Sequence, residues 1–203
     1  MRVAFLDLDH TLLVADSNQL WMSFLLSQQM ISVNDVATHE KFMDDYSNGV
    51  LDFSALQSFR IKLDASLPVE QMDKCKKIFF KKILLPAIAP LASRLLEEIK
   101  SQGVMTVVVS ATRATLIEPV AKQLGVDHVL SSCFGQDKVN QVEFWLESYG
   151  KSLLDLDESW FYSDSHNDLP LFEAVKFPIA VDPNSQLKSI ADCRNWKIIS
   201  LHS

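Results

Sequence analysis

The chain has 203 residues, of which 48% are hydrophobic and 22% are charged. This length and composition fit one compact domain with a sizeable insertion, and they exclude a disordered chain. The 19 Lys and Arg residues stand against 26 Asp and Glu residues, for a net charge of -7. Because such a chain lacks the positive field that attracts a phosphate backbone, we expect no nucleic acid partner.

The cysteines and the apolar segments predict where the protein resides. The three cysteines lie far apart, with no C-x-x-C spacing for zinc binding or disulfide exchange. Asp7 and Asp9 interrupt the apolar N-terminal stretch before a secretory signal could be completed. The apolar run at 83–91 contains two prolines and is too short to span a membrane. We therefore expect a cytoplasmic protein with no membrane partner.

Short apolar runs that are typical of buried strands recur along the chain. They span residues 3–8, 104–109, 126–130, 160–163, 179–181 and 196–201. Amphipathic helical patterns lie between the later runs, at 91–100 and 115–125, and Thr115 with Glu118 predicts a capping box for the second helix. This alternation predicts an α/β fold with a Rossmann-like parallel sheet and helices on both faces, whose ligand site lies at the carboxyl ends of the strands.

The segment after the first strand differs from this alternating pattern. Residues 16–85 contain no convincing strand, and their apolar side chains recur at helical spacing. Gly49 and Pro68 mark boundaries between the expected helices. We therefore expect an all-helical domain at 16–85, inserted into a core domain formed by 1–15 and 86–203.

Polar residues follow the predicted strands at the points where those strands end. They are Asp7 and Asp9 after the first run, Ser110 and Thr112 after the second, Lys138 at the start of a helix, and Asp164 and Asp168 after the fourth. In a parallel sheet these positions surround one crevice. Clustered carboxylates raise each other's pKa unless a hard cation neutralises them, and oxygen ligands with one Lys and one Ser suit Mg²⁺ and a phosphate. The pattern therefore predicts phosphoryl chemistry.

The order of these residues resembles the four motifs of the haloacid dehalogenase-like (HAD) phosphatase superfamily. The motifs are Asp7-x-Asp9-x-Thr11, Ser110, Lys138 and Asp164-x-x-x-Asp168. The segments 162–171 and 180–184 are similar to the phosphoserine-phosphatase-like branch, and the helical insertion is similar to its type-one cap. The resemblance covers nearly the whole chain and implies a phosphomonoester hydrolase of the HAD fold that acts on a small phosphorylated metabolite.

The resemblance also implies a role for each motif residue. Asp7 would be the nucleophile that forms an aspartyl-phosphate, and Asp9 would serve as general acid and then as general base. Ser110, Lys138 and Asn167 would bind the phosphate. The cofactor would be Mg²⁺, held by Asp7, the backbone carbonyl of Asp9, Asp164 and Asp168. Thr11 would brace the loop.

Substrate recognition is implied by two further positions. Phosphoserine phosphatases place a Glu nine residues after the nucleophile, where this chain has Asp16. They also place an Arg on a cap helix, close to Ser58 of this chain; Arg60 lies two residues further, a rotation of about 200° around a helix. In this register Arg60 would point away from the place of that Arg and reach the substrate only if the register slips. Asp16 and Arg60 are the candidate substrate residues, and we expect a small phosphomonoester bearing an amine or a hydroxyl, with poor hydrolysis of phosphoserine.

Some alternatives remain open at this stage. A phosphotransferase or mutase shares all four motifs. A receiver-like signalling module also uses an acidic cluster, but it carries its phosphorylated Asp on a middle strand, which favours the enzyme. Only Ser131 and Ser132 separate the third run from Cys133, where relatives usually carry a β-hairpin. The substrate, the oligomeric state and the effect of this short connection are not determined by the sequence.

Overall fold

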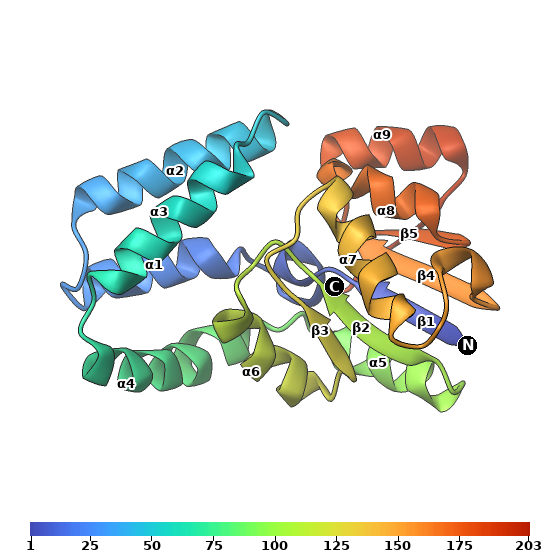
Figure 1. The fold of residues 1–203 in the computed structure, drawn as a ribbon, viewed down its shortest axis with the longest axis horizontal. Coiled ribbons are helices and arrows are strands. Elements are labelled where there is room, and N and C mark those ends of the chain that lie inside the picture. Colours follow the sequence, from blue (N-terminus) through green and yellow to red (C-terminus); the bar gives the residue numbers. More distant parts are fainter. The chain divides into compact units, whose positions relative to one another are not determined.

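The computed structural model describes residues 1–203, which divide into two compact units (Figure 1). The core unit contains Met1–Ala15 and Ala87–Ser203, and the helical unit contains Asp16–Pro86. No helix in either unit is long and apolar enough to cross a membrane.

The core unit is built on a six-stranded sheet in which every neighbouring pair of strands is parallel. Its strands are β1 (Arg2–Leu6), β2 (Met105–Val109), β3 (His128–Leu130), β4 (Glu158–Ser163), β5 (Phe177–Val181) and β6 (Lys197–Ile199). Their spatial order is β3-β2-β1-β4-β5-β6. The predicted Rossmann-like α/β fold is therefore confirmed.

Strand β1 occupies the middle of the sheet, and its position defines where a ligand would bind. Its residues Val3 to Leu6 are fully buried, as expected for a strand covered on both faces. Leu6 pairs with Val108 of β2 on one side and with Tyr162 of β4 on the other. The chain order reverses between β1 and β4, so the crevice beyond their carboxyl ends is the topological switch point at which such sheets bind ligands.

Helices cover both faces of the sheet. They are α5 (Ala92–Ser101), α6 (Ala114–Leu124), α7 (Gln136–Glu147), α8 (Leu169–Ala174) and α9 (Ser185–Arg194), with short 3₁₀ turns at Leu153–Asp155 and His166–Asp168. Apolar side chains of α7, α8 and α9 form one continuous buried cluster with one face of the sheet, including Phe5, Phe161 and Phe172. Helices α5 and α6 lie on the opposite face (Figure 1).

The capping box predicted at Thr115 is wrong. Helix α6 begins at Ala114, one residue before Thr115, and Arg113 occupies its N-cap position without a side-chain capping bond. The preceding residue, Thr112, is held by hydrogen bonds to both of its backbone polar groups. The tertiary contacts of that loop therefore determine where the helix starts, and the local sequence signal does not.

The helical unit contains α1 (Ser17–Ser27), α2 (Val33–Ser47), α3 (Phe53–Ala65) and α4 (Val69–Phe79). A π-helical turn at Phe80–Leu84 and a 3₁₀ turn at Leu85–Ala87 lead back to the core unit. Polar side chains cap three of these helices: Asp16 caps α1, Ser32 caps α2 and Asp52 caps α3. The rings of Trp21, Phe24 and Phe79 contact one another at centroid distances of 4.9–5.7 Å. This aromatic cluster gives the unit an apolar core of its own.

The two chain segments at the boundary of the core unit pair with each other. Leu13 and Ile88 form an isolated antiparallel bridge. The Val14 amide donates to the Ala87 carbonyl at 2.8 Å, and the Ala89 amide donates to the Leu12 carbonyl at 2.9 Å. The chain therefore leaves and re-enters the core unit at one place.

Candidate active site

The first group of site residues lies where β1 ends. The Asp7 amide donates to the Tyr162 carbonyl at 2.8 Å, which extends the β1–β4 pairing by one residue. A π-helical turn, Leu8–Leu12, follows directly and is interrupted by extended backbone at Asp9 and by a left-handed His10 with φ of 57°. This turn separates the buried Asp7 from the half-buried Asp9 within three residues.

Lys138 joins two of the predicted acids in a buried ion-pair cluster. Its Nζ lies 2.8 Å from Asp7 Oδ1 and 2.8 Å from Asp168 Oδ2. The Ser163 hydroxyl donates to the same Asp168 oxygen at 2.6 Å. The side chains of Lys138, Asp7 and Asp168 are at most 10% exposed. Removing one member of such a buried pair typically costs about 3–5 kcal/mol, so the three charges depend on one another.

Electrostatics sets the ionisation of this cluster. Burial raises the pKa of Asp7 to about 6; the Lys138 charge opposes this shift and the Asp168 charge adds to it. Burial, with the charges of Asp7 and Asp168, raises the pKa of Asp164 well above its usual value. Burial alone would lower the pKa of Lys138, but the two carboxylates outweigh it and hold that pKa above its usual value. The site thus gathers more negative charge than Lys138 neutralises.

The loop after β4 holds Asp164 and Asp168 through its own hydrogen bonds. The Thr11 hydroxyl accepts from the Asp164 amide at 3.1 Å and lies 3.4 Å from Asp164 Oδ1. The Ser165 hydroxyl accepts from the Asn167 amide at 3.3 Å. Thr11 therefore braces the loop, in agreement with the sequence. Asn167 contributes its backbone to this turn.

The loop after β2 contributes Ser110 and a residue to which sequence reasoning assigned no role. Ser110 is buried, and its Oγ accepts from the Thr112 amide at 3.2 Å. The Thr112 hydroxyl donates to Asp9 Oδ2 at 2.6 Å. Thr112 was placed at the correct edge of the sheet by its position after the second apolar run. The spacing of the motifs, however, does not indicate a bond between residues 103 positions apart.

The predicted substrate residues belong to the helical unit. The Asp16 carboxylate accepts from the Gln19 amide at 2.8 Å and so caps α1. Arg60 is 5% exposed and lies on the same face of α3 as the buried Leu56 and Leu63. Asp16 therefore has a structural role in its own helix, and Arg60 is part of the buried face of α3.

The Mg²⁺ that the resemblance implies would need oxygen ligands beside Asp7. No three His, Cys, Asp or Glu side chains are arranged to hold a metal ion by themselves. The acidic side chains gathered near Asp7 nevertheless offer oxygen ligands, and the raised pKa values of Asp7 and Asp164 mark carboxylates that a cation would stabilise. Mg²⁺ usually binds through one or two carboxylates and keeps several waters, so these residues fit it.

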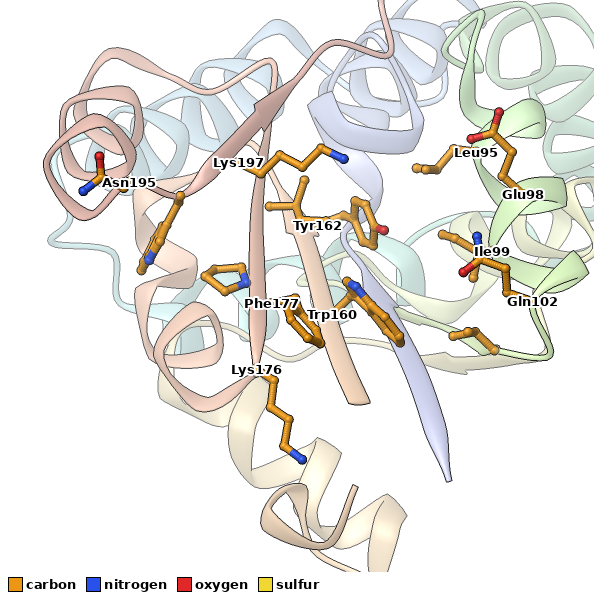
Figure 2. A pocket seen from close by; sticks show the side chains of 14 residues that line it. Leu95, Glu98, Ile99, Gln102, Trp160, Tyr162, Lys176, Phe177, Asn195 and Lys197 are labelled. Atoms are coloured by element: carbon orange, nitrogen blue, oxygen red, sulfur yellow. The ribbon is translucent and has the colours of Figure 1, made fainter. Parts of the chain in front are cut away.

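A separate cavity of about 450 Å³ lies on the α5 face of the sheet, beside β4 and β5 (Figure 2). The rings of Trp160 and Phe177 stack at its wall with a centroid distance of 5.3 Å. None of the predicted site residues lines this cavity.

Comparison with known proteins agrees with this architecture. Residues 4–173 match the family model described as haloacid dehalogenase-like hydrolase. The chain belongs to this family. It is an enzyme, a phosphatase of the haloacid dehalogenase-like hydrolase family.

Individual relatives are similar over nearly their full length. A histidinol-phosphatase of Neisseria meningitidis serogroup C (strain 8013) is 29% identical over 98% of both chains. A crystal structure of a protein with unknown function from Bordetella pertussis Tohama I has a TM-score of 0.89 and 31% identity, covering 98% of both chains. A phospho-aspartyl intermediate analogue of phosphoserine phosphatase has a TM-score of 0.65 and 17% identity, covering 100% of this chain and 93% of the other. The last similarity is one of fold.

Proposed function

We propose that this protein is a Mg²⁺-dependent phosphomonoester hydrolase that works through an aspartyl-phosphate on Asp7. The observation that carries the proposal is the buried cluster in which Lys138 Nζ contacts both Asp7 and Asp168 at 2.8 Å. A buried carboxylate at the switch point of the sheet, kept beside a permanent positive charge, is suited to attack an electron-rich phosphoryl group.

The proposed first step transfers the phosphoryl group to the protein. The Asp7 carboxylate forms a bond to phosphorus while the ester P–O bond breaks, and Asp9 gives its proton to the departing alkoxide oxygen. In the second step Asp9, now a carboxylate, takes a proton from water as the water oxygen bonds to phosphorus. The bond from phosphorus to Asp7 then breaks, which releases phosphate and restores both side chains.

Two further residues have donors suited to the phosphoryl oxygens. An ammonium has three N–H donors, of which Lys138 uses two for Asp7 and Asp168. The Ser110 oxygen accepts from the Thr112 amide, so its own O–H remains a donor. We propose that Ser110 and Lys138 hold the phosphoryl oxygens, with Asn167 beside them.

The metal would be held by Asp7, the carbonyl of Asp9, Asp164 and Asp168. When bound, Mg²⁺ would neutralise charge on the phosphoryl oxygens and balance the clustered carboxylates. The raised pKa of Asp164 supports its place in this set.

For the substrate we propose a small phosphomonoester that bears an amine, with the helical unit acting as a cap. Asp16 uses one carboxylate oxygen to cap α1 and retains acceptor capacity for an ammonium group. The full-length similarity to a protein named histidinol-phosphatase makes L-histidinol phosphate the first candidate.

The three cysteines are free, which supports a cytosolic location for such an enzyme.

A substrate panel tests this proposal. Hydrolysis of L-histidinol phosphate, phosphoserine and glycerol phosphate would be compared with Mg²⁺, and phosphate release measured with and without added alcohols. We expect an amine-bearing substrate other than phosphoserine to give the highest kcat/KM. Efficient hydrolysis of phosphoserine would refute the substrate assignment. Transfer of the phosphoryl group to an alcohol in preference to water would favour the phosphotransferase alternative.

A further inference from the structure

We propose that Thr112 is a positioning residue that selects which oxygen of Asp9 exchanges the proton with the leaving group. This inference rests on the proposed function, in which Asp9 is the general acid. It starts from one contact: the Thr112 hydroxyl donates to Asp9 Oδ2 at 2.6 Å. Thr112 is 1% exposed, so water does not compete for its side chain.

The backbone of Thr112 is fixed on both sides. Its amide donates to Ser110 Oγ at 3.2 Å, and its carbonyl accepts from the Ser132 amide at 2.9 Å. Ser132 adopts a left-handed conformation with φ of 60°, which is uncommon for a residue other than glycine. The short connection from Leu130 to Cys133 is therefore tied to the Thr112 loop by this hydrogen bond.

The side chains of Thr112 and Asp9 differ in how much freedom they have. Thr112 is β-branched and buried, which restricts its χ1 rotamers. Asp9 is half-buried and lies on the extended interruption of the π-helical turn, where no regular helix fixes its direction. A hydrogen bond from the fixed Thr112 to the carboxylate therefore restricts the rotamers of Asp9.

The bond also distinguishes the two oxygens of Asp9. A neutral carboxylic acid has one O–H donor and one carbonyl-type acceptor. Because Oδ2 accepts from Thr112, we assign the acidic proton to Oδ1. In the first step that proton passes from Oδ1 to the ester oxygen as its bond to phosphorus breaks, which leaves Asp9 ionised. In the second step Oδ1 takes a proton from water.

Leaving-group dependence separates this role from a merely structural one. A p-nitrophenolate leaves without a proton, whereas a benzyl alkoxide requires one. The value of kcat/KM reports the steps up to phosphoryl transfer. For Thr112→Val we expect kcat/KM to fall about 10- to 100-fold with benzyl phosphate and L-histidinol phosphate, and less than about 3-fold with p-nitrophenyl phosphate. Thr112→Ser, which keeps the hydroxyl, should restore most of the loss.

Control variants separate a loss of stability from the leaving-group dependence expected for Thr112. Thr106→Val removes another buried hydroxyl of the same segment, one that donates to Asp127 at 2.7 Å at the opposite end of β2. It should reduce stability without any leaving-group dependence. Thr112→Ala serves where valine prevents folding, and the melting temperature of each variant verifies its fold.

Two results would overturn the inference in different ways. An equal loss with all three substrates, in a folded Thr112 variant, would show that Thr112 only supports the loop. Asp9→Asn measured on the same substrates tests the underlying assignment. If Asp9→Asn lacks the leaving-group dependence, or if wild type hydrolyses none of the three, the proposed function itself fails. If Asp9→Asn shows the dependence and Thr112→Val does not, only the role of Thr112 is refuted.

Discussion

The acidic residues at the two edges of the parallel sheet differ in how their negative charges are balanced. At the amino edge three acids pair with separate cations: Asp157 with the N-terminal ammonium, Glu158 with Arg2, and Asp127 with Lys100. At the carboxyl edge Lys138 pairs with both Asp7 and Asp168, and burial with the charges of these two acids raises the pKa of Asp164. The negative charges of these acids at the amino edge are therefore balanced by their cation partners. At the carboxyl edge the carboxylates need further positive charge, or protonation, to be balanced.

The pKa values follow the same division. For Asp127, burial favours the neutral form, but hydrogen bonds from the Thr106 amide and hydroxyl and the Lys100 charge lower the pKa below its usual value. For Asp7, burial outweighs the attraction to Lys138 and raises the pKa to about 6. Folding thus favours the ionised form of Asp127 at one edge and the protonated form of Asp7 at the other, and a raised carboxylate pKa is the pattern expected of a functional site.

The largest effect is expected when the proposed nucleophile, Asp7, is substituted. We expect Asp7→Asn to reduce kcat by roughly 10⁴-fold or more while the protein remains folded, because the amide cannot form the aspartyl-phosphate. The matched variant, Asp127→Asn at the amino edge, should keep kcat within about 2-fold, because it acts through stability alone. Steady-state kinetics with circular dichroism distinguishes these outcomes, and substantial turnover by Asp7→Asn would contradict the mechanism.

Removal of the metal is expected to affect the function of the carboxyl edge of the sheet and to leave the amino edge unchanged. Chelation with EDTA should abolish hydrolysis, and Mg²⁺ should restore it. Ca²⁺ should inhibit, since its larger and looser coordination misplaces the reacting groups. Mg²⁺ should also raise the melting temperature of the wild type, and raise it less for Asp164→Asn. Full activity after thorough chelation would show that the acids serve another purpose.

The smallest effect concerns stability as a function of pH in the metal-free protein. A folded-state pKa of about 6 for Asp7 lies above its usual 3.8, so the unfolded chain loses this proton first. Its contribution to stability therefore falls as the pH rises from about 4 to about 6, by about 3 kcal/mol at most. Relative to wild type, Asp7→Asn should gain stability over that range.

Asp127 should show the opposite sign. Its lowered folded pKa means that the unfolded chain holds the proton longer, so ionised Asp127 stabilises the fold above its usual pKa. Asp127→Asn should therefore lose stability relative to wild type as the pH rises. Urea unfolding at several pH values in EDTA measures both trends, and the same sign for both variants would refute the contrast between the edges.

The sequence predicted the sheet and the edge at which the polar residues gather, because both follow from local patterns. Apolar runs such as 104–109 form strands wherever they are buried on both faces, and the residue that follows such a run is placed at the strand end. The structure brings Asp7, Lys138 and Asp168 into contact as the order of their elements required.

What the sequence did not predict depends on contacts between distant loops. The hydrogen bond from Thr112 to Asp9 depends on how three separate segments of the chain are folded, so it cannot be predicted from the spacing of residues in the sequence. The start of α6 was misplaced for the same reason, since the fixed Thr112 backbone outweighs the local capping signal. Arg60, in contrast, lies four residues after Leu56 and three before Leu63, so its place on the buried face of α3 could have been predicted from helical periodicity.

Trapping the covalent intermediate tests the central claim most directly. The wild-type enzyme would be mixed with a substrate it hydrolyses, in Mg²⁺, quenched in acid within a single turnover and digested for mass spectrometry. We predict one phosphoryl group on the peptide that contains Asp7, attached at that residue, and none in Asp7→Asn. Turnover without any covalent phosphoryl group, or with one on a different residue, would contradict the account.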